Sequence, residues 1–302
     1  MVNLLPSIFS VLITTEFILG NFANGIIALV NCIDWVKRHK MSSADQILTA
    51  LAVSRIVLLW VLLMNWYTVV LHPGLYSLEV RIFVRIALTV SNHLNIWFAA
   101  SLSIFYLLKV ANFSSFIFLY LKRRVKSVLL IILLGTLVFL VPHLAILCIY
   151  ENIQTNEYER NITQKTKLRD IFHFSYMSLF MLVNFTPFSM SLTSFLLLII
   201  SLWNHLKKMQ LNGKGSQDIS TKVHIRAMQT VVSFLFLYVS YFLALVTLVE
   251  SYNRLHNTLL VMLSEALAML YPLSHSFILI WGNKKLRQAL KTVRKMIRFP
   301  YQ

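Results

Sequence analysis

The chain has 302 residues, of which 58% are hydrophobic and only 13% are charged, and its formal net charge is +17. A water-soluble protein of this size would have to expose far more apolar surface than such proteins do, so the composition excludes an ordinary soluble protein. A helix crosses a membrane with about 20 mostly apolar residues. Seven stretches qualify, and they predict an all-α membrane protein with a seven-transmembrane helix bundle as one domain over 1–302: residues 8–32, 46–70, 82–108, 128–149, 171–203, 231–249 and 259–281.

Positive charge gathers in alternate connections between these stretches. More than two thirds of the 28 Lys and Arg residues lie in 33–44, 109–126, 205–226 and after Gly282. Lys and Arg are retained on the cytoplasmic side during insertion, so we expect an extracellular N-terminus and a cytoplasmic C-terminus. Basic loops beside spans face anionic lipid. The bilayer is therefore the expected partner of this charge, and nucleic acid is not.

The first two spans each carry a polar side chain at similar depth. The first span is expected to be retained, because it is too long for the apolar region of a signal peptide and lacks a basic segment before it. In the second, Arg55 lies about ten residues from the cytoplasmic start, where its guanidinium needs acceptors on neighbouring helices. Asn24 is the expected partner. Such a network could join helices or change on activation, and the sequence leaves both open.

Three further polar residues come to one level near the outer side. Asn92, Tyr241 and Glu265 lie on three different spans, each about 10–15 Å below the outer end at the rise of a helix. We expect them to form the floor and wall of an outward-facing cavity; the alternative for Glu265 is a carboxylate that reaches the outer interface. Asn92 also shares a helix face with Tyr106, about 21 Å further along the axis, so this span is expected to connect the cavity with the cytoplasmic side.

The remaining segments add few chemical signals. Asn161 opens an Asn-Ile-Thr triplet in the longest outer connection and is the expected glycosylation site. Residues 284–298 have apolar positions at helical spacing among basic ones, which predicts a short amphipathic helix on the inner membrane surface. Cys32 and Cys148 are expected near opposite membrane faces, too far apart for a disulfide.

The sequence carries no catalytic or phosphate-binding motif, so we expect neither an enzyme nor a cofactor or metal site. Histidines in and near the spans occur singly, which favours hydrogen-bonded structural roles. Three prolines fall inside spans, where they indicate either kinks or simple packing irregularity: Pro142, Pro187 and Pro272.

Six runs follow one another in order along the chain: Gly20–Gly25, Leu51–Arg55, Leu102–Phe113, His205–Gln210, Ser220–His224 and His275–Leu286. Together they resemble the signatures of the type 2 (bitter) taste receptors. Ordinary rhodopsin-like receptors differ at the same places: they carry an acidic residue at the position of Arg55, and an Asp-Arg-Tyr-type triplet where this chain has Phe105-Tyr106.

The resemblance implies a plasma-membrane G-protein-coupled receptor that binds small bitter molecules within the bundle and activates a gustducin-type (Gi-class) heterotrimeric G protein. Leu88 stands where some close relatives carry Trp, so the agonists of relatives should not be transferred to this chain. The implied agonist positions are Trp66, Leu88, Asn92, Tyr241 and Glu265; the implied activation network is Asn24, Arg55 and Ser276; and the implied G-protein face is Tyr106, Lys109, His205 and Lys208.

Three other classes fit a seven-span chain less well. A seven-span ligand-gated channel of the insect chemoreceptor kind would have its N-terminus inside, against the charge pattern. A transporter would show inverted repeats, and the sequence has no internal repeat. A rhodopsin-like receptor for another small molecule is disfavoured by the motif differences above.

Overall fold

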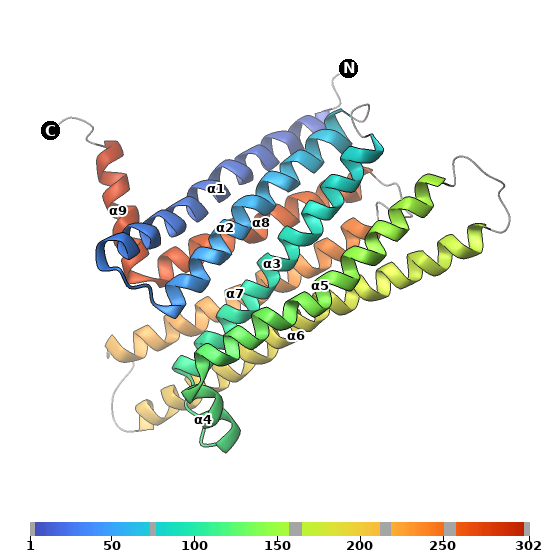
Figure 1. Ribbon diagram of the computed structural model, residues 1–302. Coiled ribbons are helices and arrows are strands. Elements are labelled where there is room, and N and C mark those ends of the chain that lie inside the picture. The colour runs from blue at the N-terminus through green and yellow to red at the C-terminus, as the bar shows by residue number, and fades with distance from the viewer. Residues whose placement is uncertain (1–3, 73–76, 157–164, 212–218, 251–257, 299–302) are drawn as a thin grey trace.

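The structure is a computed structural model that describes residues 4–72, 77–156, 165–211, 219–250 and 258–298. The described residues are almost entirely helical (Figure 1). In chain order the helices are α1 (Leu4–Arg38), α2 (Ser43–Trp66) with a π-helical turn (Tyr67–Leu71), α3 (Leu78–Val110), α4 (Phe116–Arg123), α5 (Val125–Asn156), α6 (Lys165–Leu211), α7 (Ile219–Glu250), α8 (Thr258–Gly282) and α9 (Lys284–Arg298).

Seven of these helices contain the predicted spans. Six are long and apolar enough to cross a membrane by length and composition, and α7 adds a shorter apolar stretch, Val232–Leu248. The prediction of a seven-helix membrane bundle is therefore confirmed. The helices continue past the predicted apolar stretches, and α6 alone has 47 residues. Helix α4 was not predicted.

The long helices lie side by side, and α3 is the central one, packed against α2, α5 and α6 (Figure 1). Helix α1 packs against α2 and α8, and α7 packs against α6 and α8. We call the two ends of the bundle the N-terminal end and the α9 end. Helix α9 leaves α8 at the second of these and turns across the bundle axis.

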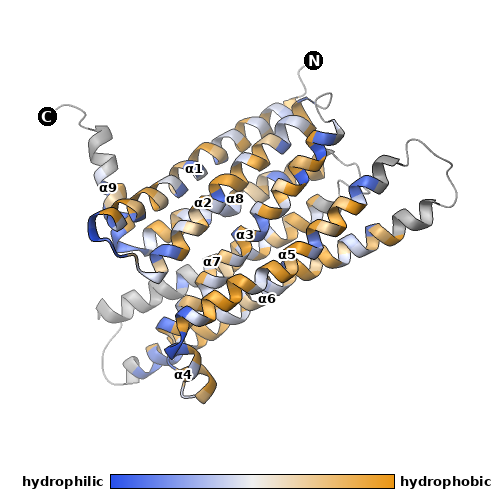
Figure 2. Ribbon diagram, viewed as in Figure 1, coloured by the Kyte–Doolittle hydropathy of each residue, from blue (hydrophilic) through white to orange (hydrophobic). Residues whose placement is uncertain are grey.

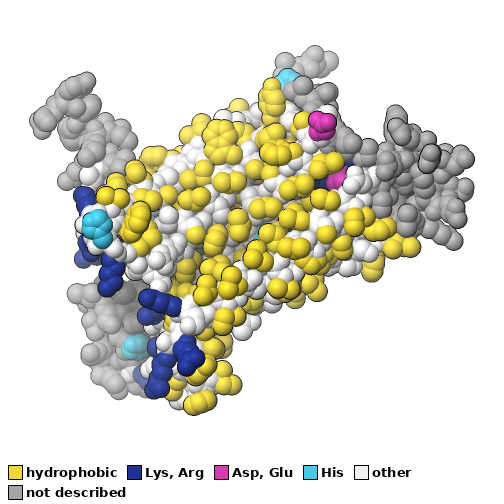
Figure 3. All heavy atoms as spheres, viewed as in Figure 1, with side chains coloured by type: hydrophobic (Ala, Val, Ile, Leu, Met, Phe, Trp, Pro, Cys, Tyr) yellow, Lys and Arg dark blue, Asp and Glu magenta, His cyan; other side chains and the backbone are white. Residues whose placement is uncertain are grey.

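Hydrophobic residues occur along the length of all the long helices (Figure 2). Large side chains such as Ile131, Val138 and Phe174 are exposed, as expected for helices that face lipid. In the view of Figure 3, Lys and Arg gather at the α9 end, around α4 and α9, and the acidic side chains in view lie toward the opposite end. The charge asymmetry seen in the sequence is therefore also an asymmetry between the two ends of the fold.

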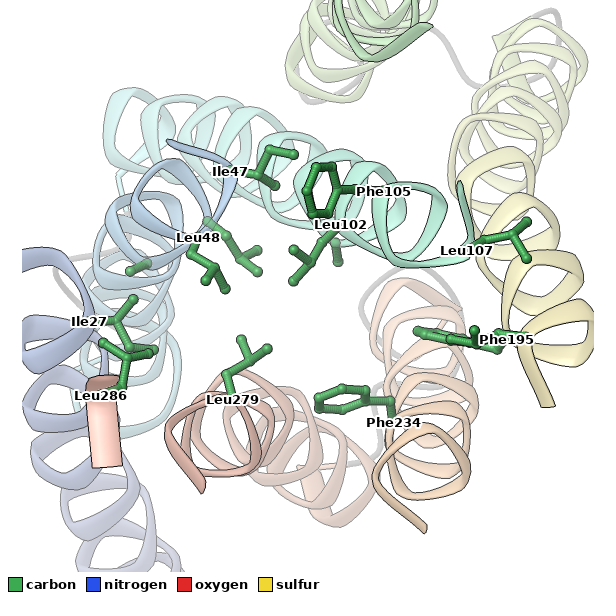
Figure 4. Close-up of a cluster of buried hydrophobic side chains, with 14 of the residues drawn as sticks. Ile27, Ile47, Leu48, Leu102, Phe105, Leu107, Phe195, Phe234, Leu279 and Leu286 are labelled. Carbon is green, nitrogen blue, oxygen red and sulfur yellow. The ribbon is translucent and has the colours of Figure 1, made fainter. Parts of the chain in front are cut away.

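A large apolar cluster holds the α9 end together (Figure 4). It includes Leu48 of α2, Leu102 of α3, Leu279 of α8 and Leu286 of α9. Helix α9 is also held by charge, because Lys285 Nζ lies 3.2 Å from a carboxylate oxygen of Asp34 on α1 and 3.2 Å from one of Asp45 on α2. The predicted amphipathic helix thus exists, and it is tied to the ends of α1 and α2.

Gly20 on α1 marks a close approach to α2. A Cβ atom built at this position would lie 2.8 Å from Leu59 Cδ1, whereas one at Gly25 would meet nothing within 4 Å. We therefore expect Gly20→Val to lower the free energy of unfolding by about 1–3 kcal/mol through overpacking. Thermal unfolding of the purified protein measures this, with Gly25→Val as the matched control. Equal melting temperatures for the two variants would contradict the close approach.

Candidate functional site

A cavity lies between six helices toward the N-terminal end of the bundle. The space between its atoms is about 770 Å³, part of it open to solvent. An apolar lining with a few polar groups is typical of small-molecule sites. Its lining comes from α2, α3, α5, α6, α7 and α8: Leu58, Leu62, Asn65, Arg85, Leu88, Thr89, Asn92, His143, Tyr176, Phe180, Tyr241, Leu245, Leu248 and Ala268.

Asn92 is the centre of a hydrogen-bonded chain at this cavity. The Tyr241 hydroxyl of α7 donates to Asn92 Oδ1 at 2.5 Å, and Asn92 Nδ2 donates to Asn184 Oδ1 of α6 at 3.0 Å. Asn184 Nδ2 in turn donates to the Phe180 carbonyl at 2.7 Å. The chain joins α7, α3 and α6, so a ligand that reaches Asn92 or Tyr241 contacts a linkage between three helices. Leu88, one turn from Asn92, also lines the cavity.

Glu265 and Trp66 lie behind this cavity and are not among the lining residues. Glu265 is 0% exposed, and its Oε1 accepts a hydrogen bond of 2.8 Å from Asn65 Nδ2 on α2. Asn65 itself lines the cavity. Trp66 is buried and donates from Nε1 to Ser10 Oγ on α1 at 3.3 Å. Glu265 therefore does not reach the surface, and its hydrogen bond to Asn65 connects it to a residue of the cavity lining.

Arg55 lies deeper in the bundle and is 0% exposed. Its Nε donates to Asn95 Oδ1 of α3 at 3.1 Å, and Nη1 donates to Ser276 Oγ of α8 at 3.0 Å. Its Nη2 donates to Nδ1 of His275, which places the proton of a neutral His275 on Nε2. The guanidinium also lies over the Tyr271 ring, 5.3 Å from its centre.

The predicted contact between Arg55 and Asn24 is indirect, which corrects the sequence interpretation. Asn24 Oδ1 accepts a hydrogen bond from Ser276 Oγ at 2.7 Å, and Ser276 is the residue that accepts from Arg55. Sequence analysis did not assign Asn95 or His275 to the network. The His275 ring also packs edge-on against Phe234 of α7, with 4.2 Å between ring centres, so the network contacts five helices.

A second charged cluster joins α3 to α5 and was missed from the sequence. Glu151 of α5 is 1% exposed, and its carboxylate lies 2.5 Å from Arg85 Nη1 and 3.1 Å from Arg81 Nε. The sequence does contain a trace of this cluster: Arg81 and Arg85 lie four residues apart at the start of one span, and Glu151 is a single acid at the end of another. Depth alone does not say that these two helices touch.

The α9 end carries a separate surface hollow. Its lining includes the predicted His205 and Lys208, together with Asn112 and Phe113 after α3. Tyr106 lines a smaller internal cavity with His275 and Phe234, and Lys109 is exposed near the end of α3. Asn161 lies outside the described residues. Across the described part of the chain, no group of three or more His, Cys, Asp or Glu residues is placed to hold a metal ion.

These features define a multi-pass helical membrane protein with a largely apolar cavity toward one end and a basic opposite end. The taste receptor protein (TAS2R) family model matches residues 1–298. The chain belongs to the type 2 (bitter) taste receptor family.

Curated relatives agree over almost the full length. The chain is 58% identical over 299 residues to human putative taste receptor type 2 member 33, covering 99% of this chain and 97% of that protein. It is 59% identical over 298 residues to taste receptor type 2 member 50 of Pan troglodytes, covering 99% and 100%. It is 57% identical over 299 residues to human taste receptor type 2 member 46, covering 99% and 97%. These relatives are named as receptors and not as enzymes.

Proposed function

We propose that this chain is a G-protein-coupled receptor of the plasma membrane that binds small bitter molecules and activates a gustducin-type heterotrimeric G protein. The observation that carries the proposal is the cavity around Asn92 at one end of α3, because the same helix continues to the basic α9 end. Lys and Arg are retained in the cytoplasm during insertion. The N-terminal end with its cavity therefore faces outward, and the α9 end faces the G protein.

The agonist contacts Leu88, Asn92 and Tyr241 directly, in this proposal. Glu265 and Trp66 act without contacting the agonist. Glu265 fixes the amide of Asn65, and Trp66 packs α2 against α1. An agonist shifts the receptor toward its active state only if it binds that state more tightly than the resting one. The chain from Tyr241 through Asn92 to Asn184 supplies a candidate for this difference, since it depends on the relative positions of three helices.

In this proposal, the conformational change that the agonist favours reaches the cytoplasmic side along α3 and through the network of Asn24, Arg55 and Ser276. The G-protein face then comprises Tyr106 and Lys109 of α3 with His205 and Lys208 of α6. His205 and Lys208 line a hollow beside the end of α3, which supports a docking surface for a partner there.

Calcium imaging of cells that express the chain with a chimeric G protein tests the proposal. A panel of bitter compounds is expected to give at least one concentration-dependent response. For such agonists, Tyr241→Phe should raise the half-maximal concentration about three- to tenfold, because Asn92 loses a buried hydrogen-bond donor. An epitope at the N-terminus should be accessible on intact cells.

Tyr67→Phe is the matched control for the removed hydroxyl. Tyr67 is exposed at the end of α2 and is not among the residues that line the cavity, so its variant should respond like the unmodified chain. A silent panel despite verified surface expression would oppose the proposed function. Equal responses of both Tyr→Phe variants to every agonist would remove Tyr241 from the binding site.

A further inference from the structure

One polar side chain of the cavity wall has no role in the contacts described so far. His143 of α5 is 3% exposed, lines the cavity, and neither of its ring nitrogens has a hydrogen-bond partner in the structure. Other buried histidines differ: His93 Nε2 pairs with the Thr136 carbonyl at 3.1 Å, and His275 accepts from Arg55. Buried polar groups are rarely left unpaired, because doing so costs free energy.

His143 lines the cavity from α5, between two contacts that join α5 to α3. It lies two turns along α5 from Thr136, which pairs with His93, and about two turns before Glu151, which pairs with Arg85. Its ring lies 5.9 Å from that of Tyr176 and 6.1 Å from that of Phe180, between ring centres. Both aromatic residues line the cavity, so His143 places two hydrogen-bonding atoms beside an aromatic wall.

The charges around the cavity restrict which ligand can use these atoms. Among the described lining residues the charged side chain is Arg85, and its guanidinium binds Glu151. The carboxylate of Glu265 is fully buried behind Asn65. A cationic ligand would therefore meet a guanidinium and no lining carboxylate, although a buried ammonium needs a partner.

We propose that His143 is a ligand-recognition residue, and that the cavity takes neutral molecules with an apolar body and a hydroxyl or carbonyl group in preference to basic amines. This inference rests on the proposed function and specifies its class of agonist. A neutral imidazole offers one N–H donor and one acceptor nitrogen. A ligand hydroxyl can therefore pair with either nitrogen, and a carbonyl or ether oxygen can pair only with the N–H.

Three compounds with one carbon skeleton test the ligand class. They are menthol, menthyl methyl ether, which only accepts hydrogen bonds, and menthylamine, which is a cation at neutral pH. Equilibrium dialysis against the full chain in lipid nanodiscs, with empty nanodiscs as the blank, gives their dissociation constants without a G protein. We expect menthol to bind at least about tenfold more tightly than menthylamine, and the ether to fall between them.

Variants at two histidines test the residue. His143→Phe keeps a ring but removes both nitrogens, and should weaken menthol binding about three- to tenfold. His143→Gln, which restores a donor and an acceptor, should recover most of this loss. His173→Phe is the matched control, because His173 is a buried histidine of α6 whose ring lies 5.9 Å from that of Tyr150 and which is not among the lining residues. It should bind menthol like the unmodified chain.

The outcomes separate this inference from the proposed function. Menthol binding that is lost in His143→Phe supports the inference, even if calcium signals are silent and oppose receptor function. Tighter binding of menthylamine, undetectable binding of menthol, or equal affinities of the His143→Phe and His173→Phe variants would overturn the inference. None of these results would alter a calcium response to other compounds.

Discussion

Replacing Arg55 with Ala is expected to lower the free energy of unfolding by about 3–5 kcal/mol, because it removes a fully buried side chain and leaves a cavity. It also leaves the oxygens of Asn95 and Ser276 and a nitrogen of His275 without their donor, and each lost buried bond adds about 1 kcal/mol. The expected shift in melting temperature is on the order of 10 °C. A thiol-reactive dye can follow unfolding at Cys148, which is partly buried, whereas the exposed Cys32 contributes a constant background.

Arg38→Ala is the control for the loss of a guanidinium as such. Arg38 is 74% exposed and pairs with Asp34 at 2.8 Å within α1, so its removal should change the free energy of unfolding by less than about 0.5 kcal/mol. Arg55→Lys should fall between the two, because an ammonium keeps the charge but lacks the planar fork that reaches three acceptors. Equal melting temperatures for Arg55→Ala and Arg38→Ala would contradict the proposed importance of the network.

The sequence predicted the bundle well because a membrane imposes a length rule on every span. It predicted helix ends poorly, since hydropathy marks only the part of a helix that lies in hydrocarbon. Helices α3 and α6 continue into polar residues at their ends, and hydropathy does not register these turns. Helix α4 was not predicted because its eight residues are too few to qualify as a span.

The sequence predicted how far along its helix each site residue lies, but not toward which neighbouring helix its side chain points. Asn92 and Tyr241 were expected at one level, and they share a hydrogen bond. Glu265 has a similar depth but bonds Asn65 on α2. A residue count gives the height of a side chain along a helix, whereas its rotation toward one neighbour or another depends on how the helices pack. For the same reason Asn24 and Arg55 are joined only through Ser276.

The distinct position of His143 could not be predicted from the sequence, for a different reason. A single histidine in a span favours a structural role, and His93 and His275 have such hydrogen bonds. His143 has none in the structure, and its sequence neighbourhood does not distinguish it from the others. The difference arises from the empty space beside its ring, which is created by residues of α3 and α6 far away in the chain.

Glu151→Gln is expected to be the second most damaging substitution, with a loss of about 2–4 kcal/mol in the free energy of unfolding. The carboxylate neutralises Arg81 and Arg85, which lie one helical turn apart on α3. Without it the two cations repel each other. Both guanidinium groups are partly exposed, so solvent relieves some of this repulsion and the cost stays below that of a fully buried unpaired charge.

A double-mutant cycle separates this charge effect from packing. Glu151→Gln, Arg85→Gln and the double variant should show a coupling energy of about 1–3 kcal/mol in thermal or denaturant unfolding. The same cycle on the Asp34–Arg38 pair, in which Arg38 is 74% exposed, should give less than about 0.5 kcal/mol. Additive effects at Glu151 and Arg85 would mean that the ion pair contributes no coupling between α3 and α5. A strong coupling would instead mean that Glu151 holds Arg85 in its place in the cavity wall. The guanidinium that lines the cavity is the one that pairs with this carboxylate.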